Sequence, residues 1–469
     1  MRVGDEEGSV SAVSASPAAK ERSFLDPVRA LQHALYRAAK ADPGRRFHAL
    51  WDKVLRRDVL WRAWVAVRRN NGAPGIDKTT LADVEEYGVA RFLEELAADL
   101  RDGRYRPLPA RRVFIPKPGQ PGQMRPLSIP SVRDRVVQAA VKAVVEPVFE
   151  ADFLPCSFGF RPRRSPHDAL QVVIDEAWRG RVWVVETDVA NCFGAIPLDE
   201  LMQAVQERVC DQSVLKLLRM LLRAGVMADG QVRRPVTGTP QGGGISPLLC
   251  NVYLHQLDRV WDVREHGVLV RFADDAVVMC KSRAQAEAAL ARLRQLLADL
   301  GLEPKEAKTR IVHLRVGGEG LTFLGFAHYM VRSPARTGKR PVTFLARWPA
   351  DKAMQHARDR LREMTDRSRL RVPVEVVVRE MNWFLNGWAA YFKYGNSARR
   401  FAQVQWYAQM RLGLFLSKRH RRGRRFGRWL VGVRSPDWLR LASLDGIVVA
   451  PRPNRSWREK PNTGGERRR

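Results

Sequence analysis

The chain has 469 residues, and 81 lysines and arginines outnumber 50 aspartates and glutamates, for a formal net charge of +31. This excess is too large for an ordinary enzyme and indicates a polyanionic partner, most simply nucleic acid. No apolar run reaches the length of a membrane-spanning helix, so no membrane partner is expected. The five cysteines form no CxxC pair, which argues against a disulfide framework or a zinc site and favours the reducing cytoplasm.

The N-terminal region is predicted to be helical. Residues 1–22 are small and polar and are expected to be disordered. Helical spacing of apolar residues runs from Phe24 to about Val67, and a second helix is expected from Thr80 to Arg101. Between them, residues 70–75 (Asn-Asn-Gly-Ala-Pro-Gly) give a strong loop signal.

A hairpin is predicted next. Residues 113–119 look like a strand that enters a Pro/Gly turn, and residues 124–130 look like its return. Lys117 and Arg125 flank the turn, where two cations could clamp a triphosphate and the arginine could bind in bidentate geometry. Isolated surface cations more often only face solvent, so that alternative stays open.

Two serines mark the starts of helices. Ser131 precedes an acid at Asp134, which is typical of a helix N-cap, and the helix behind it is apolar enough to be core. Ser282 caps another predicted helix, which ends near Gly301.

An acidic residue ends the next predicted strand. Residues 182–188 read Val-Trp-Val-Val-Glu-Thr-Asp, so Asp188 closes a strand-like run. Phe193 lies five residues further on, where a bulky ring could stack beneath an incoming sugar and clash with a 2′-hydroxyl. Spacing alone explains Phe193 about equally well as a core residue.

A glycine-rich loop, residues 237–247, precedes another helix. Glycine lets a ligand approach the backbone closely, and amide groups at a helix start favour phosphate. No Gly-Lys-Ser/Thr follows, so this is not a Walker A loop. Taken by itself, the loop is equally well explained as a tight turn.

The most informative feature is a pair of adjacent acids, Asp274 and Asp275, inside a hairpin-like apolar run from Val268 to Met279. Because side chains alternate along a strand, the two acids are expected to point to opposite faces. Unpaired acids at the tip of an apolar hairpin are costly unless a cation or a partner meets them. Together with Asp188 from a separate strand, they suit a pair of divalent cations for in-line phosphoryl transfer, and Mg²⁺ prefers such oxygen ligands. The alternative is an ordinary turn with locally satisfied acids.

Beyond about Ala346 the strand signals fade, and the chain is predicted to be mostly helical. The stretch from Ala398 to Trp429 holds ten basic residues, no acid and several interleaved aromatic residues. Such a stretch can neutralise phosphates and stack on bases, which favours RNA or DNA binding over a merely solubilising face. The basic residues are Arg399, Arg400, Arg411, Lys418, Arg419, Arg421, Arg422, Arg424, Arg425 and Arg428.

In their order, these blocks resemble the group II intron-encoded reverse transcriptase/maturase family. The family's polymerase blocks are similar to Asn71–Asp77, Ile115–Leu127, Ser157–Pro162, Asp188 with Phe193, Thr239–Leu249, Phe272–Asp275, Lys308–Arg310 and Phe323–Phe326, and its maturase-specific helix pair is similar to Asn386–Phe392. The resemblance spans roughly residues 25–430, and the ordered set is much more specific than any single block.

The resemblance implies an α+β fold of the right-hand polymerase type. Fingers and a palm with a mostly antiparallel sheet would be followed by an α-helical thumb/maturase domain. The domains expected are a disordered N-terminal extension (1–22), reverse transcriptase fingers and palm (23–345), the thumb/maturase domain or domain X (346–430), and a basic C-terminal segment that could be a DNA-binding remnant (431–469).

The resemblance also implies RNA-templated DNA synthesis from dNTPs on a primer, and binding of the parent group II intron RNA to assist splicing and retrohoming into target DNA. Two Mg²⁺ ions are expected, and a homodimer is left open. By resemblance, Asp188, Asp274 and Asp275 are the catalytic acids and hold the metal ions together with Val189; Phe193 is the sugar gate, Gln241 a nucleotide contact, and Lys117 and Arg125 the triphosphate clamp.

The sequence departs from the family pattern at several points. The segment after Asp188 lacks the usual Lys-Gly and trailing Asp, Ala276 replaces a larger residue, and Pro304 stands where an apolar strand residue is usual. None of these changes removes a metal ligand. No paired-cysteine HNH endonuclease segment follows the basic helices, so a bacterial type that primes from nicks, replication forks or a partner's cut is expected.

Two other interpretations stay open. One is a related reverse transcriptase that serves host repair or defence without an intron. The other is a non-enzymatic RNA-binding splicing factor with a decayed palm, against which the intact Asp188, Asp274 and Asp275 argue. The segment Asn386–Phe392 and the basic helices favour the intron-encoded enzyme.

Overall fold

The computed structural model describes residues 17–116, 122–228, 231–233, 242–334, 340–433 and 440–458. The chain divides into two compact units, each assembled from separate stretches of sequence. Unit 1 comprises Met1–Val113, Ser128–Phe153 and Pro197–Tyr253, and unit 2 comprises Phe114–Leu127, Leu154–Ile196 and Leu254–Arg469.

Unit 1 is mainly helical. Its elements are α1 (Pro17–Ala41), α2 (Trp51–Val54), α3 (Arg57–Asn70), α4 (Leu81–Tyr87), α5 (Val89–Arg101), the first part of β1 (Ala110–Pro116), α6 (Val132–Glu150), α9 (Leu198–Gln206), α10 (Gln212–Arg223), β4 (Val226–Ala228), β5 (Gln231–Arg233) and the first half of α11 (Ser246–Arg259). Helix α6 packs against α1 and α3 and is buried along most of its length, as its apolar sequence predicts. Ser131 caps α6 by accepting a hydrogen bond from the amide of Asp134 at 3.0 Å, which confirms that prediction.

The predicted N-terminal helices are more broken than expected. The region predicted to be helical, Phe24 to about Val67, contains three helices, and α1 already begins at Pro17, inside the extension predicted to be disordered. The helix expected from Thr80 to Arg101 is interrupted at Gly88, whose φ of 99° lies in a region that other residues rarely adopt. Helical periodicity alone does not show such a break.

The predicted hairpin is present as β1 and β2 (Met124–Ile129), which are neighbours in a sheet. Within unit 1, β1 runs parallel to β4, with Ala110 opposite Val226. Residues 114–127, the outer part of the hairpin, belong to unit 2. Lys117, predicted to flank the turn, lies outside the described residues.

Unit 2 combines two antiparallel sheets with C-terminal helices. Besides the outer hairpin and the end of α11, its elements are α7 (Pro166–Trp178), β3 (Trp183–Asp188), α8 (Cys192–Ala195), α12 (Val263–His266), β6 (Val268–Phe272), β7 (Asp275–Cys280), α13 (Arg283–Asp299), a 3₁₀ turn (Glu306–Lys308), β8 (Arg310–His313), β9 (Leu321–Phe323), β10 (Phe326–Arg332), β11 (Thr343–Pro349), α14 (Asp351–Met364), a second 3₁₀ turn (Arg367–Arg369), α15 (Val374–Phe392), α16 (Ala398–Arg419) and α17 (Arg424–Val433).

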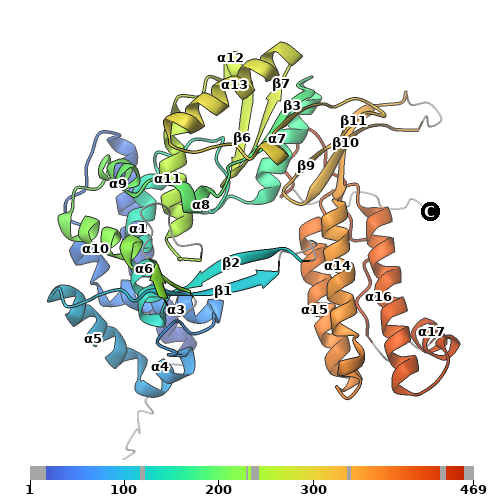
Figure 1. Ribbon diagram of the computed structural model, residues 1–469, viewed down its shortest axis with the longest axis horizontal. Coiled ribbons are helices and arrows are strands. Elements are labelled where there is room, and N and C mark those ends of the chain that lie inside the picture. The colour runs from blue at the N-terminus through green and yellow to red at the C-terminus, as the bar shows by residue number, and fades with distance from the viewer. Residues whose placement is uncertain are drawn as a thin grey trace, which may run out of the picture. The chain divides into compact units, whose positions relative to one another are not determined.

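The first sheet of unit 2 has the strand order β6-β7-β3-β8, and every pair in it is antiparallel, as predicted for the palm. Helix α7 packs on β6 and β7, and α13 packs on β3 and β7 (Figure 1). The strands are buried because both helices cover them, so β7 is apolar from Ala276 to Cys280 rather than alternating.

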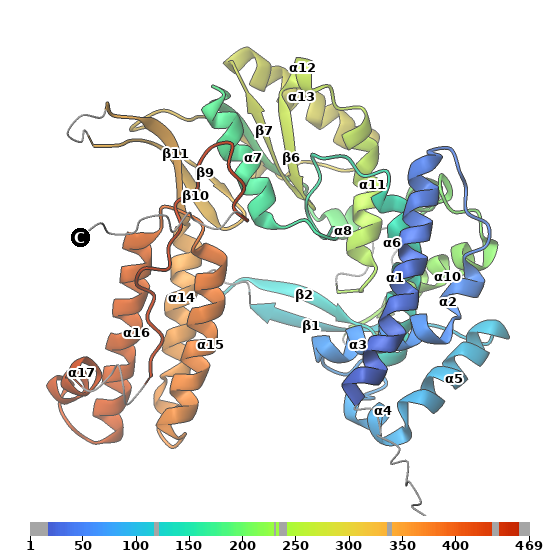
Figure 2. The same cartoon turned by 180° about the vertical axis from the view of Figure 1, so that it is seen from behind.

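The second sheet, β11-β10-β9, leads directly into the C-terminal helices. Helices α14, α15 and α16 run side by side in both views (Figures 1 and 2), and α17 packs on α16. One apolar core continues from Val173 of α7 through Phe326 of β10 to Leu385 of α15 and Leu416 of α16. The fold is therefore the predicted mixture of helix and sheet followed by a helical region.

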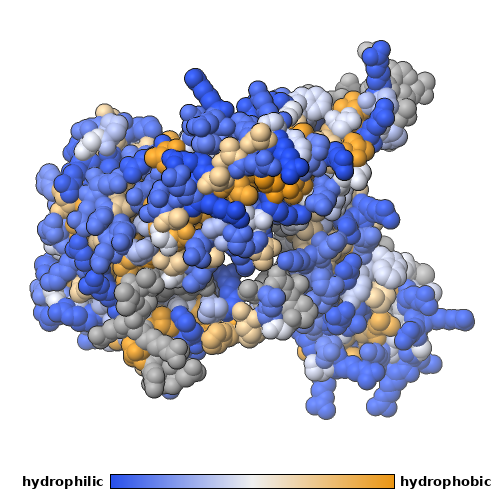
Figure 3. Space-filling model, turned by 45° about the horizontal axis from the view of Figure 1, so that its top comes forward, coloured by the Kyte–Doolittle hydropathy of each residue, from blue (hydrophilic) through white to orange (hydrophobic). Residues whose placement is uncertain are grey.

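The face of the molecule seen in Figure 3 is largely polar. Hydrophilic residues cover most of the face seen in Figure 3, with apolar residues confined to smaller patches. Within the described ranges, no helix combines the length and the apolar character needed to cross a membrane.

Two glycines set the contact between α16 and α17. A Cβ atom added to Gly427 would overlap the carbonyl of Gly413 and the hydroxyl of Ser417. The same hydroxyl accepts a hydrogen bond from the Gly427 amide at 3.0 Å and donates to the Gly423 carbonyl at 3.1 Å. Helix α17 can therefore dock only through a residue without a side chain.

Gly427→Ala is expected to lower the free energy of unfolding by about 1–3 kcal/mol, because the two helix backbones must separate. The matched control is Gly432→Ala in the same helix, where a Cβ meets nothing within 4 Å. That control should be neutral or up to about 1 kcal/mol stabilising, since alanine favours helix over glycine. Urea denaturation of both variants checks the expectation, and equal stability of the two would contradict the close contact.

Candidate active site

The two adjacent acids sit at a tight turn. Strand β6 ends at Phe272 and β7 begins at Asp275, so Ala273 and Asp274 form the connection. Ala273 adopts a φ of 57°, in the left-handed region. The premise that both acids belong to one strand is therefore wrong, because Asp274 lies in the turn and only Asp275 belongs to a strand.

The sheet brings the third acid to the same place. Asp188, the last residue of β3, lies directly opposite Asp275 of β7 in the antiparallel register. The amide of Val189 donates a hydrogen bond to the carbonyl of Asp274 at 3.1 Å. The three acids predicted to act together thus gather at one end of the sheet.

A lysine stands between two of these acids. The Nζ atom of Lys308 lies 2.6 Å from Oδ2 of Asp188 and 3.8 Å from Oδ1 of Asp275. The Asp188 side chain is 11% exposed, whereas that of Asp275 is 44% exposed, so the cluster opens toward solvent on the Asp275 side.

The electrostatics show that the acids repel one another. Burial and then the Asp188 carboxylate raise the pKa of Asp275 to about 7, against the opposing charge of Lys308. Burial also raises the pKa of Asp274, and Asp188 adds to this effect while Lys308 and Arg125 oppose it. Burial acts to lower the pKa of Lys308, but Asp188 and Asp275 outweigh it and raise that pKa. The site therefore favours a cation at its centre.

The segment 303–309 secures the end of β3. The Lys305 amide donates to the Asp188 carbonyl at 2.7 Å, and the Ala190 amide donates to the Glu303 carbonyl at 2.8 Å. Pro304 lies between these two bonds, opposite Val189. The departure from the family pattern at Pro304 is tolerated because neither bond uses an amide of residue 304.

A buried ion pair stabilises the turn between β6 and β7. Arg271 and Asp258 are almost fully buried, and Nε of Arg271 donates to Oδ1 of Asp258 at 2.9 Å. The same guanidinium donates to the Ala273 carbonyl at 3.0 Å and to the Ser157 hydroxyl at 2.9 Å. A Cβ added to Gly159 would overlap the Ala273 amide. Arg271 and Gly159 therefore fix the position of the residue just before Asp274.

Sequence reasoning assigned no role to Arg271, Asp258 or Lys308. The available signal for Arg271 was a charged residue in an otherwise apolar strand, which is costly unless the charge is paired. Its partner, Asp258, lies at the end of α11, and no local pattern links the two positions.

Of the four residues predicted to contact the nucleotide, the structure describes two, Arg125 and Phe193. Arg125, in β2, is exposed and acts on the charge of Asp274, as a residue near the acids would. Phe193 lies in the short helix α8 that follows Asp188, and it is partly buried. Lys117 and Gln241 lie outside the described residues.

The predicted basic stretch divides into two groups. Three of its arginines brace the helices: Arg400 pairs with Asp351 at 3.1 Å, while Arg411 and Arg419 donate to backbone carbonyls of the chain between α14 and α15. The exposed group lies at the end of α16 and on α17, apart from Arg399 at the start of α16. This group consists of Arg399, Lys418, Arg421, Arg422, Arg424, Arg425 and Arg428.

A groove beside this exposed group contains an aromatic residue. A cavity of about 410 Å³ between α16 and α17 is lined by Trp406, Arg424 and Arg428, among others. Trp406 is 65% exposed. An exposed indole next to two arginines is a surface on which a base could stack while its phosphates are neutralised.

The fit of the acids to a metal ion can be judged from their number and charge. Within the described part of the chain, no three His, Cys, Asp or Glu side chains are close enough to hold a metal ion by themselves. Mg²⁺ usually takes only one or two carboxylates and completes its shell with water and substrate phosphates. The facing pair Asp188 and Asp275 meets that requirement, so the residues fit a substrate-dependent metal site.

Comparison with known proteins agrees with this geometry. The family model for reverse transcriptase (RNA-dependent DNA polymerase) matches residues 115–345, and that for the group II intron maturase-specific domain matches residues 354–430. Protein YkfC of Escherichia coli is 34% identical over 371 residues, which cover 70% of this chain and 94% of YkfC. The group II intron-encoded protein LtrA of Lactococcus lactis is 34% identical over 235 residues, or 50% of this chain and 39% of LtrA.

The chain thus carries a reverse transcriptase domain followed by a maturase domain. It belongs to the group II intron reverse transcriptase/maturase family, and its class of activity is RNA-directed DNA polymerase.

Arg271→Met is expected to lower the free energy of unfolding by about 3–5 kcal/mol, because it leaves Asp258 charged, buried and unpaired. Replacing both partners, as Arg271→Met with Asp258→Leu, should recover part of that loss. The control Arg283→Met removes an exposed pair with Glu287 and should cost no more than about 0.5 kcal/mol. Denaturant titration measures all three; a small effect of Arg271→Met alone would show that the pair does not support the turn.

Proposed function

We propose that this protein copies RNA into DNA at the end of the β6-β7-β3-β8 sheet and binds a group II intron RNA through α16 and α17. The observation that carries the proposal is the facing pair Asp188 and Asp275, which share the ammonium group of Lys308, with Asp274 in the adjoining turn. Partly burying four charged groups together costs free energy of folding. Phosphoryl transfer is a reaction that requires such a concentration of charge to stabilise its transition state.

The proposed metal ligands are Asp188, Asp274, Asp275 and the main chain of Val189. The amide N–H of Val189 donates a hydrogen bond to the carbonyl of Asp274. The proposed ligand atom is therefore the carbonyl oxygen of Val189. Two Mg²⁺ ions, when bound, would activate the primer 3′-hydroxyl and stabilise the charge of the leaving pyrophosphate. Lys308 already binds Asp188, so a divalent ion would compete with its ammonium group for the carboxylates.

The remaining residues would position the dNTP. Arg125 is close enough to influence Asp274, which supports a role in holding the triphosphate, with Lys117 as its predicted partner across the turn. Phe193 is proposed to exclude ribonucleotides, and Gln241 to contact the bound nucleotide. In such a reaction positioning and charge stabilisation supply most of the rate enhancement.

RNA binding is proposed for the exposed basic group and the Trp406 groove. Six of the group's seven positive charges lie at the end of α16 and on α17, and acidic residues are absent from residues 398–429. Retrohoming would add target DNA as a further partner. The braced residues Arg400, Arg411 and Arg419 would support this surface without contacting the RNA.

Asp274→Ala is expected to reduce Mg²⁺-dependent primer extension on an RNA template by about 10³-fold or more, because the charge that holds the metal is lost. RNA binding should be unchanged, since the exposed basic group is intact. The control is Glu287→Gln, an exposed acid on α13, which should extend primers normally. Extension by Asp274→Ala at a rate similar to wild type would refute the catalytic assignment.

Phe193→Ala is expected to admit ribonucleotides. Removing the ring should raise the efficiency of rNTP incorporation, kcat/KM, while that of dNTP incorporation changes much less. Single-nucleotide incorporation with matched dNTP and rNTP measures the ratio. An unchanged ratio would eliminate Phe193 as the sugar gate.

The double variant Arg424→Gln with Arg425→Gln is expected to weaken RNA binding and to reduce the slope of log K against log salt by about 1 for each lost phosphate contact. The charge-matched control, Arg264→Gln with Arg283→Gln, removes two exposed cations from α12 and α13 and should leave the slope unchanged. Fluorescence anisotropy over a salt series gives the slope for each double variant. Equal slopes for the two would show that RNA does not bind through Arg424 and Arg425.

A further inference from the structure

A second group of basic residues surrounds Arg347 of β11, away from the proposed catalytic acids. Arg347 is completely buried, and its Nε donates to the Tyr394 carbonyl at 2.8 Å. Its Nη1 and Nη2 atoms are buried and have no hydrogen-bond partner. A buried guanidinium with two unsatisfied nitrogens is costly, and an anion would relieve that cost.

The neighbours of Arg347 offset this cost only in part: the Phe326 ring lies 5.4 Å from the guanidinium carbon and Asp175 contributes an opposite charge, whereas His328 adds to the cost. His328 lies directly opposite on β10, is also completely buried, and has no partner at either ring nitrogen. Burial, with the charge of Arg347 adding to it, lowers the pKa of His328 to about 3, so the imidazole is neutral at physiological pH. Burial likewise lowers the pKa of Arg347, to about 10, which still leaves the guanidinium charged.

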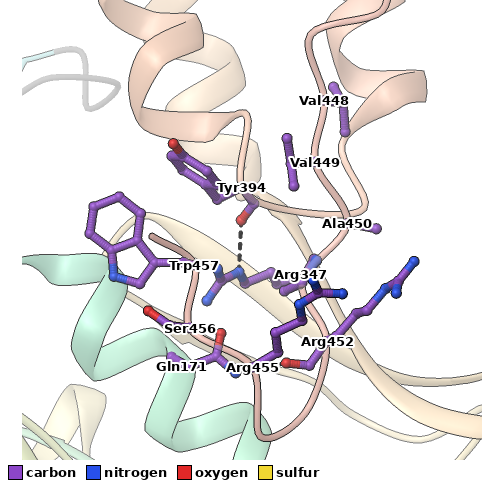
Figure 4. Close-up of a pocket in the computed structure, with 11 residues that line it drawn as sticks. Gln171, Arg347, Tyr394, Val448, Val449, Ala450, Arg452, Arg455, Ser456 and Trp457 are labelled. Carbon is purple, nitrogen blue, oxygen red and sulfur yellow. Dashed lines mark hydrogen bonds between the residues drawn. The ribbon is translucent and has the colours of Figure 1, made fainter. Parts of the chain in front are cut away.

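Arg347 lines a cavity of about 300 Å³ that the C-terminal segment closes (Figure 4). Arg452 and Arg455 add two more cations. Gln171 of α7 also lines the cavity, but its Nε2 already donates to Asp175 and to the Arg452 carbonyl, so it offers no donor to an anion. Arg452 and Ser456 are exposed, so the cavity reaches solvent at this side. Two aromatic rings, Tyr394 and Trp457, form part of its wall and lie 5.1 Å apart between centroids.

No carboxylate is among the described residues that line this cavity, and two acids of α7, Asp168 and Asp175, are already engaged. Asp175 accepts hydrogen bonds from Nε2 of Gln171 at 2.8 Å and from the Asn454 amide at 2.7 Å. Asp168 accepts from Nε1 of Trp457 at 2.7 Å and pairs with Arg458. These acids hold the C-terminal segment against α7, and they leave Arg347 without a hydrogen-bonded counter-ion.

We propose that this cavity binds a terminal phosphate group, carried either by a free mononucleotide or by the 5′ end of an RNA. Arginine binds phosphate in bidentate geometry, and two nitrogens of Arg347 are available for it. The volume lies at the lower end of small-molecule sites, which suits a chain end better than a strand that passes through. The aromatic wall offers a surface for the attached nucleoside.

The site is separate from the proposed polymerase centre. None of the catalytic acids lines it, and the contributing elements are α7, β11, the segment after α15 and residues 448–457. Its occupancy can therefore be tested in a protein whose polymerase activity has been removed.

The test compares two oligoribonucleotides of one sequence, one with a 5′-phosphate and one with a 5′-hydroxyl, at the same salt concentration with the full chain carrying Asp274→Ala. The 5′-phosphate form is expected to bind about tenfold more tightly, a difference of about 1.4 kcal/mol. Binding through the basic helices contributes equally to both oligonucleotides, so the ratio isolates the phosphate site. AMP and adenosine, tested as ligands by thermal shift, distinguish a free nucleotide from an RNA end as the source.

Arg347→Met is expected to abolish the preference for phosphate, and Arg452→Gln at the exposed rim, which should fold normally, is expected to reduce it at least threefold. Arg332→Met, an exposed arginine on the neighbouring strand β10, is the control and should retain the full ratio. Stabilisation by AMP but not by adenosine, lost in the same two variants, supports the site even if the RNA end is not bound. Equal binding of both oligonucleotides together with no effect of AMP, or a preference that survives both variants, would overturn the proposal.

Discussion

The buried ion pair between Arg271 and Asp258 is the interaction on which the candidate active site depends. It joins α11 to β6 and fixes the carbonyl of Ala273, so the turn that carries Asp274 has one position. Register in the sheet then places Asp275 opposite Asp188. A change of one residue in that register would turn the side chain of Asp188 or Asp275 to the other face of the sheet.

The charge at this site is opposite in sign to that of the chain as a whole. A protein with a net charge of +31 holds three acids at one end of a sheet, and Lys308 and Arg125 partly neutralise them. In the proposed function, the basic surface attracts the nucleic acid, whereas the acidic cluster needs metal ions and phosphates before it can bind the reacting groups. This division of charge fits an enzyme that holds a long polyanion and acts on one bond of it.

Sequence patterns could predict the strands, the cap at Ser131 and the three acids, because these signals are local. An aspartate that ends an apolar run or interrupts a hairpin stands out without any knowledge of the fold. The broken helix at Gly88, the Arg271–Asp258 pair and the glycine contact between α16 and α17 could not be predicted in this way. Each depends on a backbone angle or on a partner that is distant in sequence.

The most direct measurement is a structure of the protein with an RNA template, a DNA primer, an incoming dNTP and Mn²⁺ located by its anomalous scattering. The account predicts manganese within about 2.2 Å of carboxylate oxygens of Asp188 and Asp275, with Lys308 no longer bound to Asp188. Manganese bound elsewhere, while the bond from Lys308 to Asp188 persists in the loaded complex, would contradict the account.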